Sequence, residues 1–126
     1  MTESVEEFIK RKNEQFIRER YKEISFKHIT RKGKFYFKRK DWVFMPQSNL
    51  PKKVFVFERL EKIRVDIGDN RGTKIGEEEY RIGYFIVGEI GNRKDKWTWG
   101  QFCPLIPIKD FNKLLYLAKN KGVILE

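Results

Sequence analysis

The sequence has few of the residues that build disulfides, metal centres and histidine-based active sites. Among 126 residues, Cys103 is the single cysteine and His28 is the single histidine. An intrachain disulfide and a cysteine-based metal cluster are therefore excluded, and we expect no cofactor and no metal ion. Cys103, next to Pro104, is expected to be a small buried apolar residue rather than a nucleophile.

Long apolar runs and a targeting segment are also missing. No stretch approaches the roughly 18–20 consecutive apolar residues that a membrane-spanning helix requires, so we expect no membrane partner. The first seven residues carry three glutamates and no basic residue, unlike the basic and then apolar start of a signal peptide. Together with the single cysteine, this favours a cytoplasmic location, where thiols stay reduced.

Common catalytic and nucleotide-binding motifs are missing as well. The sequence contains no GxxxxGK(S/T) loop, no GxGxxG turn and no GxSxG elbow. Any histidine-based triad or dyad would have to use His28. The sequence favours a non-catalytic protein over an enzyme, and chemistry that uses only carboxylates, lysines or tyrosines stays open.

The chain nevertheless contains enough apolar material for one core. Hydrophobic residues make up 40% of the chain and aromatic residues 15%, against a charged fraction of 37%. A disordered chain would be poorer in aromatic side chains, and 126 residues is close to the commonest size of one domain. We therefore predict a single domain over residues 1–126.

The positive charge is concentrated in one quarter of the chain. The formal net charge is +10, and residues 10–40 alone hold thirteen lysines and arginines against three glutamates. The surplus in that segment equals the net charge of the whole chain, because the flanking segments cancel one another. Such a field attracts polyanions, such as nucleic acid or an acidic protein surface.

The N-terminal segment predicts a helix over residues 5–23. Ser4 and Glu7 have the spacing of a capping box, and no glycine or proline interrupts the segment that follows. Its apolar side is expected to widen towards the C-terminal end, where Ile17 and Tyr21 fall at helical spacing.

The region of residues 25–103 predicts an antiparallel meander. Residues 25–38 alternate around a turn at Gly33 and predict a β-hairpin. The basic run at residues 38–41 predicts a second turn, before a short strand at residues 42–45. Further strands are expected to begin near residues 53, 62, 80 and 96, so the sheet should have about six or seven strands.

The C-terminal segment predicts an amphipathic helix over residues 109–120. Its apolar residues follow the i, i+3, i+4, i+7 spacing, and Gly122 stands where a left-handed residue commonly ends a helix. The predicted fold is α+β, with an N-terminal helix, an antiparallel sheet of about six or seven strands, and the C-terminal helix packed on one face.

The basic and aromatic hairpin is the strongest candidate for function. Cationic side chains neutralise phosphates and aromatic rings stack on unpaired bases, and residues 24–40 combine both types without one acidic residue. The sequence therefore predicts a small, non-catalytic protein that binds DNA or RNA. The residues expected to contact it are Lys27, Arg31, Lys32, Lys34, Tyr36, Lys38, Arg39 and Lys40, with Phe26 as a second ring for stacking. In the alternative, Phe35 and Phe37 point into the core and the lysines solvate an edge strand.

Other interpretations stay open. The same basic face would suit an acidic protein partner, and strand edges would suit a homodimer. A small metal-dependent nuclease would need carboxylates that gather around a cation. The candidates for that role are Asp66, Asp69, Glu77, Glu78 and Glu79. Trp97, Trp99 and Phe102 are either core residues or the lining of a ligand site.

Overall fold

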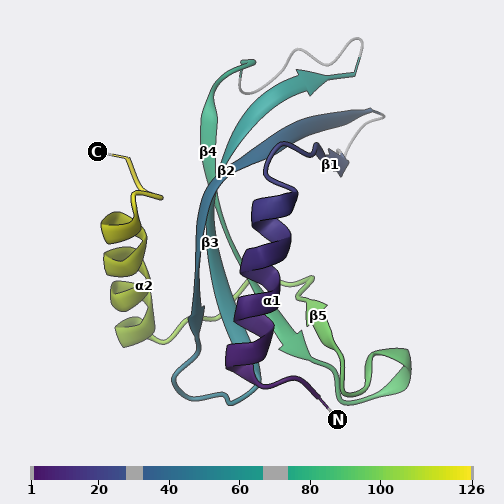
Figure 1. Cartoon of the computed structure of the whole chain (residues 1–126), viewed down its shortest axis with the longest axis vertical. Coiled ribbons are helices and arrows are strands. Elements are labelled where there is room, and N and C mark those ends of the chain that lie inside the picture. The colour runs from purple at the N-terminus through teal and green to yellow at the C-terminus, as the bar shows by residue number, and fades with distance from the viewer. Residues whose placement is uncertain (1, 28–32, 67–73, 126) are drawn as a thin grey trace.

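The computed structural model is α+β, as the sequence predicts, and it describes residues 2–27, 33–66 and 74–125 (Figure 1). Helix α1 (Val5–Arg18) comes first and helix α2 (Ile108–Lys121) last. Between them, the described residues form five antiparallel strands, which lie in one sheet in chain order. The strands are β1 (Ile24–Lys27), β2 (Lys34–Pro46), β3 (Lys53–Val65), β4 (Glu78–Val87) and β5 (Trp97–Trp99), with a short 3-10 helix, η1 (Gly91–Arg93), before β5.

The expected count of six or seven strands is wrong, because two pairs of expected strands are continuous. The short strand at residues 42–45 is part of β2, and the strands expected near residues 53 and 62 both lie in β3. The basic run at residues 38–41 does not turn. It stays extended because β2 remains paired with β3 on both sides of a β-bulge between Arg39 and Asp41.

The two helices lie on opposite faces of the curled sheet (Figure 1). Phe8 and Phe16 of α1 pack on one face, and Leu114 and Ala118 of α2 pack on the other. Alternation along β3 supplies both cores, because successive side chains of a strand point to opposite faces. On the α1 face lie Val54 and Val56, with Trp42, Phe44 and Phe85; on the α2 face lie Phe55 and Phe57, with Met45 and Val123.

Helix α1 begins as predicted but ends earlier. The capping box is confirmed, since Ser4 and Glu7 each accept from the other's backbone N–H. The helix ends at Arg18 instead of residue 23, with Glu19 as its C-cap, because the chain turns there to deliver β1. The predicted apolar side at Ile17 and Tyr21 is therefore wrong, and these side chains are 62% and 81% exposed.

Helix α2 matches its predicted bounds within about one residue, and Gly122 ends it with φ of 86°. The segment before it corrects another expectation. Residues 100–107 form neither helix nor strand, and Cys103 is exposed rather than buried. Neither described helix is long and apolar enough to cross a membrane.

Replacement of the helix cap should measurably destabilise the protein. Ser4→Ala removes the side-chain acceptor of the Glu7 N–H, and loss of such a cap costs about 1 kcal/mol. The thermal midpoint should fall by about 4 °C in calorimetry. Ser48→Ala is the control, because Ser48 bonds to Asp110 through its backbone N–H and not through its side chain. Equal midpoints for the two variants would contradict the capping role.

Candidate nucleic-acid interface

The structure divides the basic residues of the predicted interface between the two faces of the sheet. β1 pairs with the first part of β2, in a register that sets Lys27 opposite Lys34. Alternating residues of β2 share a face, and cross-strand partners share it too. This places five of the predicted residues together on one side, which we call the lysine face: Lys27, Lys34, Tyr36, Lys38 and Lys40.

Of the other three predicted residues, the structure describes only Arg39, and it is not on the lysine face. Arg39 points the opposite way, towards α1, where its guanidinium lies 3.6 Å from the ring centre of Phe16. Arg31 and Lys32, like His28, lie outside the residues that the structure describes. The contiguous basic run of the sequence is therefore not one continuous surface.

At the hairpin end of the lysine face, Lys27 and Lys34 stand directly opposite each other. Like charges in this position destabilise a strand pair, so an anion bound between them would relieve the repulsion. The Lys34 N–H donates to Asp66 Oδ2 over 2.7 Å, which fixes the backbone here.

The ring of Tyr36 already has partners. Its hydroxyl donates to Asp66 Oδ1 over 3.2 Å, and the Arg64 guanidinium lies 3.7 Å from its ring centre. Arg64 is in turn held by Glu23 over 2.8 Å. A base that stacks on this side therefore meets the Arg64 guanidinium before it meets the tyrosine.

Lys38 and Lys40 share a single acidic partner on β3. Their Nζ atoms lie 3.5 and 3.4 Å from the same oxygen, Oε1 of Glu61. Burial acts to raise the pKa of Glu61, but the two lysines outweigh it and hold that pKa below the ordinary 4.5. The hairpin sequence contains no acidic residue, so it gave no sign of this partner. Glu61 comes from the neighbouring strand, β3.

Behind the lysine face, Arg39 belongs to a buried ion-pair network. Glu58 is fully buried and accepts from Arg39 over 2.7 Å and from Arg81 over 2.9 Å. Arg81 also lies over the rings of Phe26 and Trp99, at 5.1 and 4.9 Å. Phe26 packs with Phe35 and Phe37, so it is part of an aromatic cluster and not a free ring.

The outer edge of β2 is open beyond its short pairing with β1, which ends at Phe37. No other described strand pairs with that edge, and charged side chains cap part of it. Asp41 accepts from the Trp42 N–H over 2.9 Å, while Lys121 of α2 donates to the Trp42 carbonyl. Lys121 and Asp41 also form an ion pair at 3.2 Å.

Sequence reasoning missed two residues at this edge, Arg20 and Tyr21. They follow the early end of α1 and line a pocket of about 120 Å³ together with Lys38, Arg39 and Lys40. Arg20 lies 5.0 Å from the Trp42 ring centre. The helical pattern extended through both residues, so no signal in the sequence pointed to this pocket.

The carboxylates that were considered for a nuclease site and that the structure describes are not gathered around one point. Within residues 2–27, 33–66 and 74–125, no group of three or more histidine, cysteine or acidic side chains is placed to hold a metal ion. Asp66 bonds to Lys34 and Tyr36, and Glu78 pairs with Arg59. Asp69 lies outside the described residues.

The aromatic residues near β5 have different roles. Trp97 belongs to the core, stacked on Phe8 at 4.2 Å with its indole N–H donating to the Glu3 carbonyl. Trp99 and the exposed Phe102 line a largely apolar hollow of about 260 Å³ beside Tyr84. This hollow lies at the β5 edge of the sheet, whereas the lysine face lies at the β1 and β2 edge.

No known protein family, curated protein or solved structure matches this chain.

Loss of the Glu58 carboxylate should cost far more stability than loss of an exposed one. Glu58→Gln leaves Arg39 and Arg81 without their shared counter-charge, and breaking a buried pair in this way costs about 3–5 kcal/mol. Glu78→Gln, which removes a partly exposed partner of Arg59, should cost about 1 kcal/mol or less. Urea unfolding measures both, and equal losses would show that the network adds little.

The pKa of Glu61 should depend on the two lysines. Lys38→Ala with Lys40→Ala leaves only burial acting on the carboxyl, so its pKa should rise to 4.5 or above, as followed by NMR titration. The pKa of Glu61 is lower in the folded state than in the unfolded state. The ion pairs with Lys38 and Lys40 therefore stabilise the fold fully at pH values above the unfolded-state pKa. They lose this effect as the pH falls through the folded-state pKa. The pKa of Glu7, which hydrogen bonds from Ser4 lower, should stay the same in this variant. If the pKa of Glu61 also stayed the same, the two lysines would not be what lowers it.

Proposed function

We propose that this protein binds nucleic acid without catalysis and without strong sequence preference, using the lysine face to contact phosphates. The observation that carries the proposal is the shortage of acidic partners on that face. Two of its lysines share one carboxylate oxygen, and two others stand opposite each other across β1 and β2. Each arrangement leaves positive charge that a polyanion would neutralise with release of its counterions.

The shape of the face supports a strand-like ligand. Lys34, Tyr36, Lys38 and Lys40 follow one another at every second residue of β2, so side chains on this face recur about every 7 Å along an extended line. Arg64, stacked on Tyr36, adds a planar cation on which a base can stack. These contacts are made to the phosphate backbone and to the flat faces of the bases, so they do not depend on the nucleotide sequence. A cytoplasmic location is part of the proposal.

A protein-interaction module is the second candidate, and a different surface favours it. Phe102, Leu105 and Ile108 are each more than 80% exposed, in and just after the irregular segment that follows β5. Exposed apolar side chains that cluster on a surface commonly mark a protein contact, and these three follow one another at every third residue of the chain. This surface is separate from the lysine face, so the two candidate functions are compatible.

Removal of three lysines should weaken binding to all sequences alike. Lys34→Ala, Lys38→Ala and Lys40→Ala together should flatten the slope of log affinity against log salt by about two, at about 0.7 per phosphate contact on a single strand. Fluorescence anisotropy with labelled DNA and RNA oligonucleotides of unrelated sequence measures this slope.

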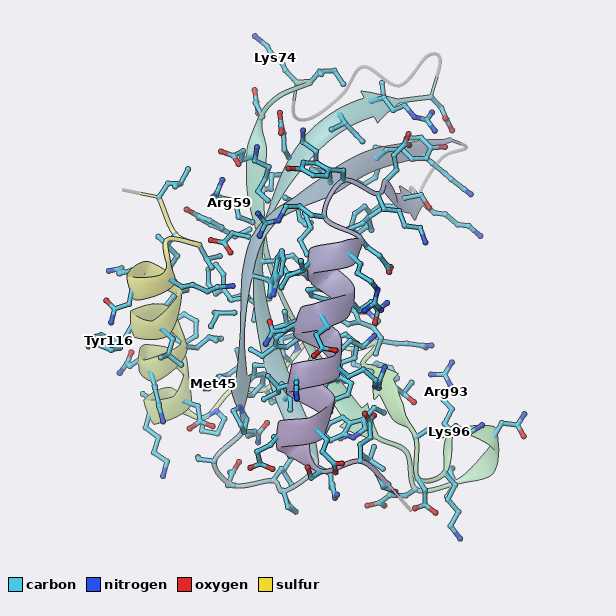
Figure 2. The ribbon with its side chains drawn as sticks, in the orientation of Figure 1. Met45, Arg59, Lys74, Arg93, Lys96 and Tyr116 are labelled. Carbon is cyan, nitrogen blue, oxygen red and sulfur yellow. The ribbon has the colours of Figure 1, made fainter. Side chains whose placement is uncertain are left out.

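The matched control removes three lysines elsewhere: Lys96, Lys109 and Lys113. All three are exposed, and Lys96 lies at the end of the molecule near β5 (Figure 2). The control should keep the slope of the unchanged protein. Equal slopes for the two triple variants would assign binding to net charge alone. Binding that is absent or independent of salt would overturn the proposal.

A further inference from the structure

The pocket at the open edge of β2 is lined by four cations and one aromatic ring. It lies where the chain leaves α1 and passes β2, and its volume is about 120 Å³. That is well above the roughly 10–15 Å³ that one water molecule requires in a cavity, so the pocket has room for one small polyanionic group. The lining residues are Arg20, Tyr21, Lys38, Arg39 and Lys40.

The charges around this pocket do not balance. Arg39 is paired with Glu58, and Lys38 and Lys40 share Glu61. The four cations thus have two carboxylates between them, and Glu58 is also shared with Arg81. The carbonyl end of α1 adds about half a negative charge nearby. A surplus of more than one positive charge therefore remains at the pocket.

Arg20 is the pocket residue whose charge and hydrogen-bond donors have the fewest partners in the fold. Among the described residues no carboxylate forms an ion pair with it, and its buried Nε has no hydrogen-bond partner. Its guanidinium lies over Trp42, 5.0 Å from the ring centre, so this contact holds it near the pocket before any ligand arrives. A buried donor without a partner is costly, and a planar guanidinium is the side chain best suited to bind phosphate oxygens in pairs.

We propose that this pocket binds the terminal phosphate of a nucleic-acid strand. A phosphate monoester carries about two negative charges at pH 7, which matches the surplus better than the single charge of an internal phosphodiester. A terminal group also has one ester link rather than two, so it can enter the pocket while the strand leaves along the lysine face. The inference rests on the proposed function and adds the recognition of a strand end.

Glu61 is the counter-ion that the phosphate displaces. Both of its contacts, at 3.5 and 3.4 Å, are long for charge-assisted hydrogen bonds, which are commonly about 2.7–2.9 Å. Lys38 and Lys40 can therefore turn from the carboxylate to a phosphate without loss of strong bonds. Neutralising Glu61 should strengthen phosphate binding, whereas neutralising Arg20 should weaken it.

The test compares one oligonucleotide with and without a terminal phosphate, at the 5′ end and at the 3′ end separately. At pH 7.5, we expect the phosphorylated strand to bind at least about tenfold tighter at one end, the effect of one charge-assisted hydrogen bond. Arg20→Gln should bring that ratio close to one, and it should weaken binding of the unphosphorylated strand no more than Arg93→Gln does. Glu61→Gln should increase the ratio.

Two controls separate the pocket from net charge. Arg93→Gln removes an arginine near β5, at the other end of the molecule (Figure 2), and Glu89→Gln neutralises an exposed glutamate there. Both should keep the ratio of the unchanged protein. A ratio near one at both ends, or one that Arg93→Gln reduces as much as Arg20→Gln, would overturn the inference.

Inorganic phosphate distinguishes failure of the inference from failure of the proposed function. Phosphate should shift the NMR signals of Arg20 and Lys40 and leave those of Lys96 in place, whether or not oligonucleotides bind. Shifts at the pocket without oligonucleotide binding would overturn the proposed function and keep a phosphate site. Oligonucleotide binding without these shifts would keep the function and overturn the pocket.

Discussion

The buried carboxylate of Glu58 is the interaction on which the arrangement of this protein depends. It lies on the central strand β3 and binds Arg39 of β2 and Arg81 of β4. Through those two guanidinium groups it reaches rings of α1, β1 and β5, because Arg39 covers Phe16 while Arg81 covers Phe26 and Trp99. One charge therefore connects all five described strands to the first helix. It also turns Arg39 away from the lysine face, so this network decides which cations are left for a ligand.

The sequence predicted two helix ends correctly, the start of α1 and the end of α2, because capping residues next to each end determine them. The Ser4 and Glu7 capping box and the left-handed Gly122 were confirmed because each acts within one helical turn. The early end of α1 was not predicted, since the helical period continues through Arg20. Tertiary contacts end the helix there, because the chain turns towards β1 and the Arg20 guanidinium lies over the ring of Trp42.

The candidate site was predictable only as a concentration of charge. The sequence identified Lys38, Arg39 and Lys40 as a group, but their partners Glu58 and Glu61 lie some twenty residues away on β3. Pairing with β3 therefore gives neighbouring residues different faces and different partners. Arg39 pairs with buried Glu58, whereas Lys38 and Lys40 share Glu61. The continuity of β2 through this basic run has the same origin, because a bulge opposite β3 replaces the expected turn.

The cap on the edge of β2 has a consequence for how the chain folds. Lys121 bonds to the Trp42 carbonyl across a separation of 79 residues, so this part of the edge stays uncovered until α2 has been synthesised and has packed. Contacts between such distant residues slow folding, and unpaired strand edges in partly folded chains promote aggregation. The last turn of α2 therefore covers this edge only late in folding, and until then the Trp42 carbonyl is open to pairing with another strand.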